Sequence, residues 1–227
     1  MRSIVLLFMT VTIGLSQQRE PRQIASEREN TPSIFGGMGV HVVSAADIVG
    51  YINATTTQSQ RVDDFGTAVD FFGGIDIPVG SDWGIAIEHS YLFKTYTVPG
   101  NLGGVYDLYY SIQAPSILLQ KVMKGKGYFV KFSGGGGYHF GSMTQKVSTF
   151  GVTTEYTARG IGIVFDAVAQ TAFGEDLYGY IGGTTGSGFL GTLKEGNGNS
   201  LKMPRTGAEV SLNYFHAGIR FGIVQYF

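Results

Sequence analysis

The sequence predicts an all-β protein, an eight-stranded antiparallel up-and-down transmembrane β-barrel. Three observations point to this fold class. Glycine is abundant, with 35 among 227 residues, and each glycine inside a helix costs about 1 kcal/mol. From residue 34 onward, apolar residues alternate with small or polar ones, as they do on the two faces of a strand. The connections alternate between short turns and longer polar segments, which is typical of barrels that cross a membrane.

Four segments in the first half of the chain carry the alternating pattern. In 34–43 the alternation starts directly after a polar stretch, and 65–77 is the clearest case, with apolar side chains on one phase and small or acidic ones on the other. In 83–94 isoleucine and aromatic residues alternate with small residues and isolated charges. In 106–121 polar residues such as Asp107 recur on one phase. Each segment is therefore predicted to be a strand with one apolar face.

The second half of the chain continues the pattern. In 128–139 aromatic residues and valine alternate with Lys131 and glycines, and in 160–166 isoleucine and phenylalanine alternate with glycine and aspartate. The segment 177–193 is rich in glycine and threonine and has the weakest pattern. In 218–227 isoleucine and phenylalanine alternate with small residues and an arginine. The chain is thus expected to form eight strands.

The connections separate into two classes by length. Short turns are expected at 78–82, 123–127 and 173–176, and longer connections at 45–63, 97–104, 142–157 and 194–206. In an up-and-down barrel, successive connections lie at alternate ends, so the short turns share one end with both chain termini. A register slip near Pro115 or near Tyr214 would reverse the faces locally.

The N-terminal residues differ in composition from the rest. A basic second residue precedes a short apolar run, and Gly14 and Ser16 are small residues at the positions that precede a cleavage site. Residues 1–16 are therefore interpreted as a signal peptide, whose apolar run is too short to span a bilayer. Residues 17–33 are expected to be a flexible periplasmic lead-in, and residues 34–227 the barrel.

The composition excludes several other classes of protein. Aromatic residues make up 13% and the formal net charge is -1, which argues against a disordered chain and against nucleic acid as a partner. Cysteine is absent from the sequence, which excludes disulfides, thiolate metal sites and a lipidated cysteine anchor. The four histidines, His41, His89, His139 and His216, show no metal-ligand spacing. We expect no metal site and no cofactor.

The polar phase of the strands indicates which face lies inside. A soluble surface would be rich in lysine and glutamate, whereas this phase holds glycine, alanine and serine with isolated charges of both signs. Small side chains suit the narrow interior of an eight-stranded barrel, and charges buried there need partners. We therefore expect a polar network in the lumen. Its members are Asp70, Asp76, Glu88, Lys94, Asp107, Lys131, Asp166 and Arg220.

Aromatic residues near the strand ends indicate two girdles at the membrane surfaces. The expected girdle residues are Trp83, Tyr91, Phe93, Tyr106, Tyr110 and Tyr128. The last strand ends in an aromatic residue, with Phe221, Ile223 and Phe227 on one phase. This pattern is similar to the signal that the barrel assembly machinery recognises in outer-membrane proteins.

These features together resemble the small outer-membrane barrel proteins of the OmpX-, OmpW- and OmpA-like group, and in particular the PorT-like β-barrel domain family. The segment 111–121 looks like that family's apolar-Pro-x-Leu-Leu-x-Lys strand, with a short basic turn at 124–127 and an aromatic strand ending in glycines at 128–137. The segment 218–227 is similar to the family's last strand. The resemblance implies a monomeric barrel in a Gram-negative type outer membrane, in contact with outer-membrane lipid.

The resemblance implies little about function, because one fold serves many functions. We expect a structural or surface-interaction role carried by the longer loops, with an unknown surface ligand and without catalysis. A small passive pore or hydrophobic-solute channel is the first alternative. A soluble exported barrel that binds an apolar ligand is the second, and it requires the apolar phase to face inward. Glu88, His89 and Ser90 contain catalytic residue types, but neighbours on a strand point to opposite faces and cannot form a triad.

Overall fold

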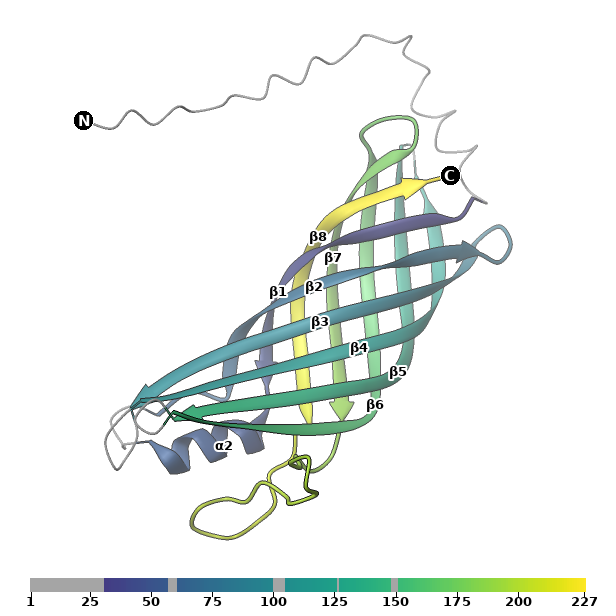
Figure 1. Ribbon diagram of the computed structural model, residues 1–227. Coiled ribbons are helices and arrows are strands. Elements are labelled where there is room, and N and C mark those ends of the chain that lie inside the picture. The colour runs from purple at the N-terminus through teal and green to yellow at the C-terminus, as the bar shows by residue number, and fades with distance from the viewer. Residues whose placement is uncertain (1–30, 57–60, 100–104, 126, 148–150) are drawn as a thin grey trace, which may run out of the picture.

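The computed structural model describes residues 31–56, 61–99, 105–125, 127–147 and 151–227, and within them eight strands close into an antiparallel barrel with one helix at its end (Figure 1). The elements are β1 Ser33–Ser44, α2 Ala46–Thr55, β2 Phe65–Pro78, β3 Trp83–Pro99, β4 Val105–Lys124, β5 Tyr128–Val147, β6 Val152–Ala172, β7 Leu177–Phe189 and β8 Tyr214–Tyr226. The predicted fold class is confirmed. The predicted signal peptide and most of the predicted lead-in lie outside the described residues.

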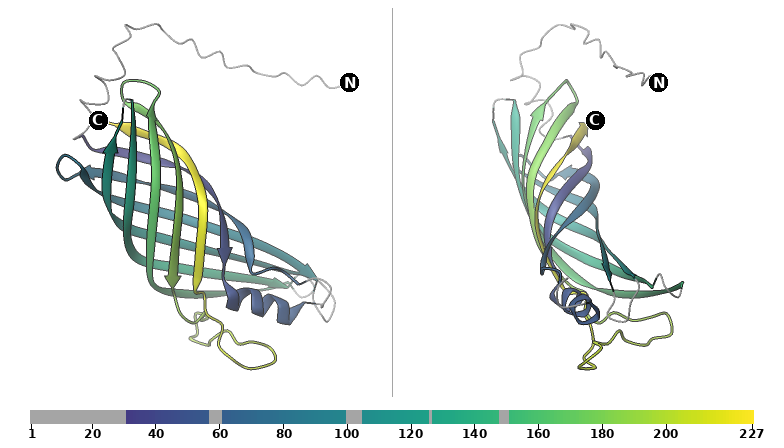
Figure 2. Two further views of the ribbon diagram at one scale, coloured as in Figure 1. Left: turned by 180° about the vertical axis from the view of Figure 1, so that it is seen from behind. Right: turned by 90° about the vertical axis from the view of Figure 1, so that its left-hand side faces the viewer.

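Each strand pairs with the next along the chain, and β1 closes the barrel against β8, with Ser33 opposite Tyr226. Three tight turns join β2 to β3, β4 to β5 and β6 to β7. In the first and third, backbone hydrogen bonds run from Val79 to Trp83 at 2.8 Å and from Phe173 to Leu177 at 2.9 Å. The start of β1 and the end of β8 lie at this short-turn end (Figure 2), as predicted.

The strands differ in length, which makes the opposite end asymmetric. β3 to β6 contain 17, 20, 20 and 21 residues, whereas β1, β2, β7 and β8 contain 12 to 14. We call the part of β3 to β6 beyond the other strands the sheet extension (Figures 1 and 2). Much of the connection predicted at 142–157 is therefore strand. The prediction was wrong because the polar residues there include several threonines and Tyr156, which suit a strand.

A loop-end cap, formed by α2 and residues 190–213, covers the inside of the sheet extension. The connection predicted at 45–63 contains α2, in which Ile48, Tyr51 and Ile52 are buried at helical spacing. The strand predicted to reach residue 193 ends at Phe189, and Leu193 is buried in the cap. The cap forms its own apolar core with inward side chains of the sheet extension. This core includes Val98, Leu108, Tyr110, Ile112, Met143, Tyr156, Leu201, Val210 and Leu212.

The outer wall between the cap and the short turns is apolar. Ile219 on β8 is 54% exposed, whereas its neighbour Arg220 is 1% exposed inside the barrel. A continuous apolar wall of this extent is far larger than the exposed patches of soluble proteins, and a closed barrel satisfies its backbone without water. The barrel is therefore transmembrane. Further residues of this wall are Ile34, Met38, Val40, Phe71, Ile75, Ile85, Ile87, Ile117, Leu119, Phe132, Ile163, Phe165 and Ile181.

Among the described residues, no helix is long and apolar enough to cross a membrane.

Neither position shows a register slip that would reverse the faces, and β7 pairs with β8 at one offset from Leu177 with Gln225 to Gly188 with Tyr214. The pairs Gln113 with Phe140 and Ser116 with Gly137 keep one offset on both sides of Pro115. Here β4 and β5 approach closely. A Cβ added to Gly137 would lie only 1.8 Å from the carbonyl oxygen of Pro115. Glycine is the residue that permits this contact.

Candidate functional site: a polar network in the barrel lumen

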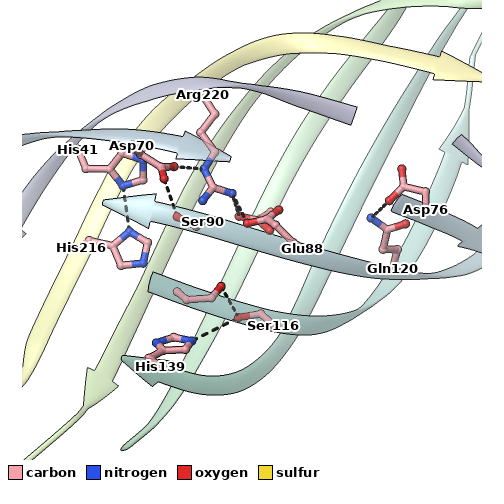
Figure 3. A network of polar contacts seen from close by, with 12 residues as sticks. His41, Asp70, Asp76, Glu88, Ser90, Ser116, Gln120, His139, His216 and Arg220 are labelled. Atoms are coloured by element: carbon pink, nitrogen blue, oxygen red, sulfur yellow. Dashed lines mark hydrogen bonds and ion pairs between the residues drawn. The ribbon is translucent and has the colours of Figure 1, made fainter. Parts of the chain in front are cut away.

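The lumen holds a cluster of charges centred on Arg220 (Figure 3). From β8, its Nε donates to Asp70 Oδ2 at 2.7 Å and its Nη1 donates to Glu88 Oε1 at 2.7 Å. Asp166 Oδ1 on β6 lies 3.8 Å from the same Nη1. The guanidinium carbon also lies 4.6 Å from the ring centre of Phe72. One planar cation thus joins carboxylates from three other strands, a geometry that arginine suits better than lysine.

Asp70 extends the cluster toward the loop end. It accepts a hydrogen bond from Ser90 Oγ at 2.5 Å, and His41 Nε2 lies 3.2 Å from its Oδ2. His41 Nδ1 in turn lies 2.9 Å from His216 Nδ1, so one of these two nitrogens carries the shared proton. The ion cluster therefore continues into a pair of imidazole rings.

A second imidazole contact lies between this pair and the cap. His139 Nδ1 is 2.8 Å from the Tyr214 hydroxyl, and His139 Nε2 is 3.3 Å from Ser116 Oγ. The ring of Tyr214 lies beside that of His216, with centres 5.8 Å apart. These histidines were not among the residues predicted to form the lumen network. Their inward phase, shared with Arg220 and Lys131, is the signal that would have placed them in the network.

A separate ion pair lies nearer the short turns. Lys131 Nζ donates to Asp76 Oδ2 at 2.5 Å, and Gln120 Nε2 donates to Asp76 Oδ1 at 3.1 Å. Next to it the Tyr226 hydroxyl donates to Gln170 Oε1 at 2.6 Å. Buried aromatic rings pack around the two ion clusters, a use of aromatic residues that was not predicted from the sequence. They include Phe35, Phe72, Phe129, Tyr178 and Tyr180.

These contacts leave little open space in the lumen. The cavities lined by the network measure about 30, 10 and 10 Å³, and a single water needs roughly 10–15 Å³. No group of three histidine, aspartate or glutamate residues within the described chain is arranged to hold a metal ion. His89 lies exposed on the outer wall while Glu88 and Ser90 are buried inside. The arrangement holds the strands together around paired charges.

Six of the eight predicted network residues lie buried in the lumen, and the two others lie near the loop end. Lys94 is half-buried on the inward phase, with its amine 4.7 Å from the ring centre of Tyr96. Asp107 is on the outward phase of β4 and accepts a hydrogen bond from Thr97 at 2.8 Å, so its prediction as a lumen residue was wrong.

Asp107 faces outward because the polar and apolar faces of the strands exchange sides in the sheet extension. On the short-turn side of Pro115, the outward residues of β4 are Ile117 and Leu119, which face lipid. On the loop-end side of Pro115, Leu108, Tyr110 and Ile112 turn inward to the cap core, whereas Asp107, Ser111 and Gln113 are on the outward phase. Tyr110 follows this rule, because it is buried inside and stacks on Tyr96 with ring centres 6.3 Å apart. Its prediction as a girdle residue was therefore wrong as well.

The other predicted girdle residues are placed on the outer wall, except Tyr106, whose side chain lies outside the described residues. Tyr91 and Phe93 form one aromatic group with Phe71 and Tyr109 toward the loop end. Trp83 and Tyr128 are exposed at the short-turn end.

The short-turn end also carries a surface ion pair beside Trp83. Lys121 Nζ lies 3.1 Å from Asp82 Oδ2, and its hydrogen bond lowers the pKa of Asp82. Phe221, Ile223 and Phe227 are all exposed on the outside of the barrel, and their role as an assembly signal stays a prediction.

Comparison with known proteins agrees with this geometry. No protein-family model and no curated protein sequence matches the chain, so the PorT-like resemblance stays a prediction. The structure is similar to that of Neisserial surface protein A, with a TM-score of 0.51 at 8% identity over 86% of this chain and 97% of that one. It is also similar to a major outer membrane protein from Thermus thermophilus, with a TM-score of 0.54 at 12% identity over 86% and 99% of the two chains. The chain therefore has the fold of the small outer-membrane β-barrels.

Proposed function

We propose that the protein resides in an outer membrane, does not conduct solutes, and acts at the cell surface through its loop end. The observation that supports this most directly is the filled interior. Paired charges and aromatic rings occupy the lumen, and the loop-end cap closes it on one side. The pore alternative needs a continuous water path, and the soluble alternative needs the apolar phase inside the barrel rather than on its outer wall.

The sheet extension is the part that suits an interaction at the surface. The pairing of β2 with β3 ends at Val69 and Phe93, and that of β7 with β6 ends at Phe189 and Ile161. In the described residues, both lateral edges of the extension therefore lack a neighbouring strand, apart from one bridge between Thr157 and Lys194. Open edges of this kind present backbone groups that can pair with another chain.

Reconstitution in planar bilayers tests the closed lumen. We expect the full-length barrel to give no channel events under conditions in which a porin, added to the same bilayer as a control, conducts. The physical reason is that ions would have to displace buried charge pairs to pass. Reproducible single-channel steps from the purified barrel would contradict the proposal and favour the pore.

Cysteine labelling on intact cells tests the orientation, and the natural chain lacks cysteine. A Lys146→Cys variant places a thiol on the exposed sheet extension, and Glu175→Cys places one on an exposed short turn. With a membrane-impermeant maleimide, we expect labelling of the first and protection of the second until the cells are lysed. The reverse result would put the loop end in the periplasm and remove the surface role.

A further inference from the structure

A cleft of about 760 Å³ lies on the outer wall at the loop end, separate from the lumen network. Most of its lining consists of outward residues of β4, β5 and β6, and Gly141, Ala158 and the residues Leu190, Thr192 and Lys194 after β7 complete it. Two backbone hydrogen bonds, from Thr157 to Lys194 at 2.8 Å and from Lys194 to Thr157 at 2.9 Å, fix the loop against β6. The position of Lys194 beside the strand is therefore set by the fold.

The strand register arranges the lining in rows. One row runs across three strands and the loop as Ser111, Ser142, Thr157 and Lys194. The row next to it runs as Gln113, Phe140 and Arg159. The Ser111 and Ser142 hydroxyls are 3.0 Å apart at the floor of the cleft. Hydroxyl groups, a side-chain amide, an ammonium and a guanidinium thus face one space, and all of them can donate hydrogen bonds.

The charges in the cleft favour an anion. Arg159 and Lys194 carry positive charge in the lining and Glu155 carries negative charge, while Glu209 at the rim accepts a hydrogen bond from the lining residue Thr192 and lies beside Lys194, so Arg159 is the cation available to a ligand. Within the described part of the chain, the Arg159 guanidinium forms no ion pair. Lys194 lies near Glu209 in the same loop, where it contributes to lowering the pKa of that carboxyl. An exposed guanidinium beside hydroxyl donors is suited to a phosphate group, which it can bind through two parallel hydrogen bonds.

The level of the cleft along the barrel axis indicates which kind of molecule would supply the phosphate group. The row directly below Arg159 contains Tyr138, Ile161 and Phe189, which are all exposed and belong to the apolar wall. The two rows are two residues apart along each strand, or roughly 7 Å. The cleft therefore lies where the apolar wall ends, at the level that lipid headgroups occupy, and lipid chains attached to a bound headgroup would lie over the apolar row.

We propose that this cleft binds the phosphorylated headgroup of a lipid in the surrounding leaflet, with Arg159 and Lys194 as the phosphate-binding residues. The proposal is independent of whether the lumen conducts, and it assigns a binding site to the outer wall of the barrel. The acyl chains supply contact with the apolar row, and the hydroxyl row supplies further donors to the phosphate oxygens.

Native mass spectrometry of the full-length barrel, released from detergent micelles, tests this site with defined probes. Dioleoyl phosphatidic acid supplies the phosphate and the chains, dioleoylglycerol supplies the chains alone, and glycerol 3-phosphate supplies the headgroup alone. We expect retention of phosphatidic acid, little retention of dioleoylglycerol, and no displacement of bound lipid by a large excess of glycerol 3-phosphate.

Paired substitutions test whether Arg159 and Lys194 bind the phosphate group. In Arg159→Gln with Lys194→Gln we expect retention of phosphatidic acid to fall by about tenfold or more, the usual effect of losing hydrogen bonds to a charged group. Lys202→Gln with Arg205→Gln is the matched control, because both residues are exposed in the same loop outside the cleft. A shift in gel migration on boiling shows that each variant is folded.

Three results would overturn the proposal. They are equal retention of the two lipids by the natural chain, full displacement by glycerol 3-phosphate, and equal loss of binding in the cleft variant and its control. The first and second concern the natural chain alone, so the test does not depend on how the variants fold.

Discussion

Replacing Arg220 by methionine is expected to destabilise the barrel by about 3–5 kcal/mol, the usual cost of leaving buried charge without its partner. The change removes the cation that contacts Asp70, Glu88 and Asp166 inside the lumen. Methionine keeps much of the side-chain volume, so the loss reports on charge rather than on a cavity. The measurement is the free energy of unfolding in urea with the barrel in lipid vesicles, and Arg205→Met in the exposed loop is the control.

A compensating variant separates charge from packing. When Asp70→Asn and Glu88→Gln are added to Arg220→Met, most of the uncompensated charge is gone, and we expect much of the lost stability to return. Neutral replacements of a whole buried ion cluster are often tolerated for this reason. If Arg220→Met alone unfolds at the same urea concentration as the natural chain, the ion cluster does not stabilise the barrel.

Replacing Gly137 by alanine is expected to destabilise the barrel by about 1–3 kcal/mol, as overpacking does in a closely packed interior. The added methyl group would meet the backbone of β4, 1.8 Å from the Pro115 carbonyl oxygen and 2.9 Å from the Ser116 Cα. Backbone atoms cannot move aside as the end of a flexible side chain does, so β4 and β5 would have to separate. Folded yield and the free energy of unfolding in urea both measure the effect.

Gly183 on β7 provides the matched control for this substitution. A Cβ added there has its nearest neighbour, the carbonyl oxygen of Gly218, at 3.8 Å, which is ordinary contact. Both glycines lie within strands, so the effect of alanine on the unfolded chain is the same in each. We expect Gly183→Ala to be neutral or slightly stabilising. Equal effects at the two positions would show that the close approach of β4 and β5 does not limit stability.

The alternating pattern was sufficient to predict the strand number, the short turns and the inward face of most lumen charges. Asp70, Glu88 and Asp166 were assigned from phase alone, and the structure places them around Arg220. Their mutual contact was not predictable in detail. The place of a residue in the alternating pattern gives the face of the strand on which its side chain lies. Contact between two side chains also requires that they lie at the same level along the barrel axis. That level depends on turn geometry and on the stagger of neighbouring strands.

The wrong predictions of side-chain orientation have one physical origin. They follow from a single rule for the whole strand, with apolar residues outward toward lipid. In the sheet extension the apolar cap core lies inside and polar side chains such as Asp107 lie outside, so the rule inverts along β4, and Asp107 and Tyr110 were assigned to the wrong faces. The helix α2 was missed because it spans only 10 residues, and its buried stripe becomes informative only once the inverted interior is known.

The position of Arg220 in the chain has a consequence for how the barrel forms. The carboxylates of Asp70, Glu88 and Asp166 belong to β2, β3 and β6, whereas their shared cation belongs to β8, the last strand to be synthesised. Any partly assembled sheet without β8 therefore carries an excess of negative charge that must stay hydrated. Docking of β8 neutralises that charge and removes the need for water in the interior, so we expect closure of the seam and desolvation of the interior to occur as one event.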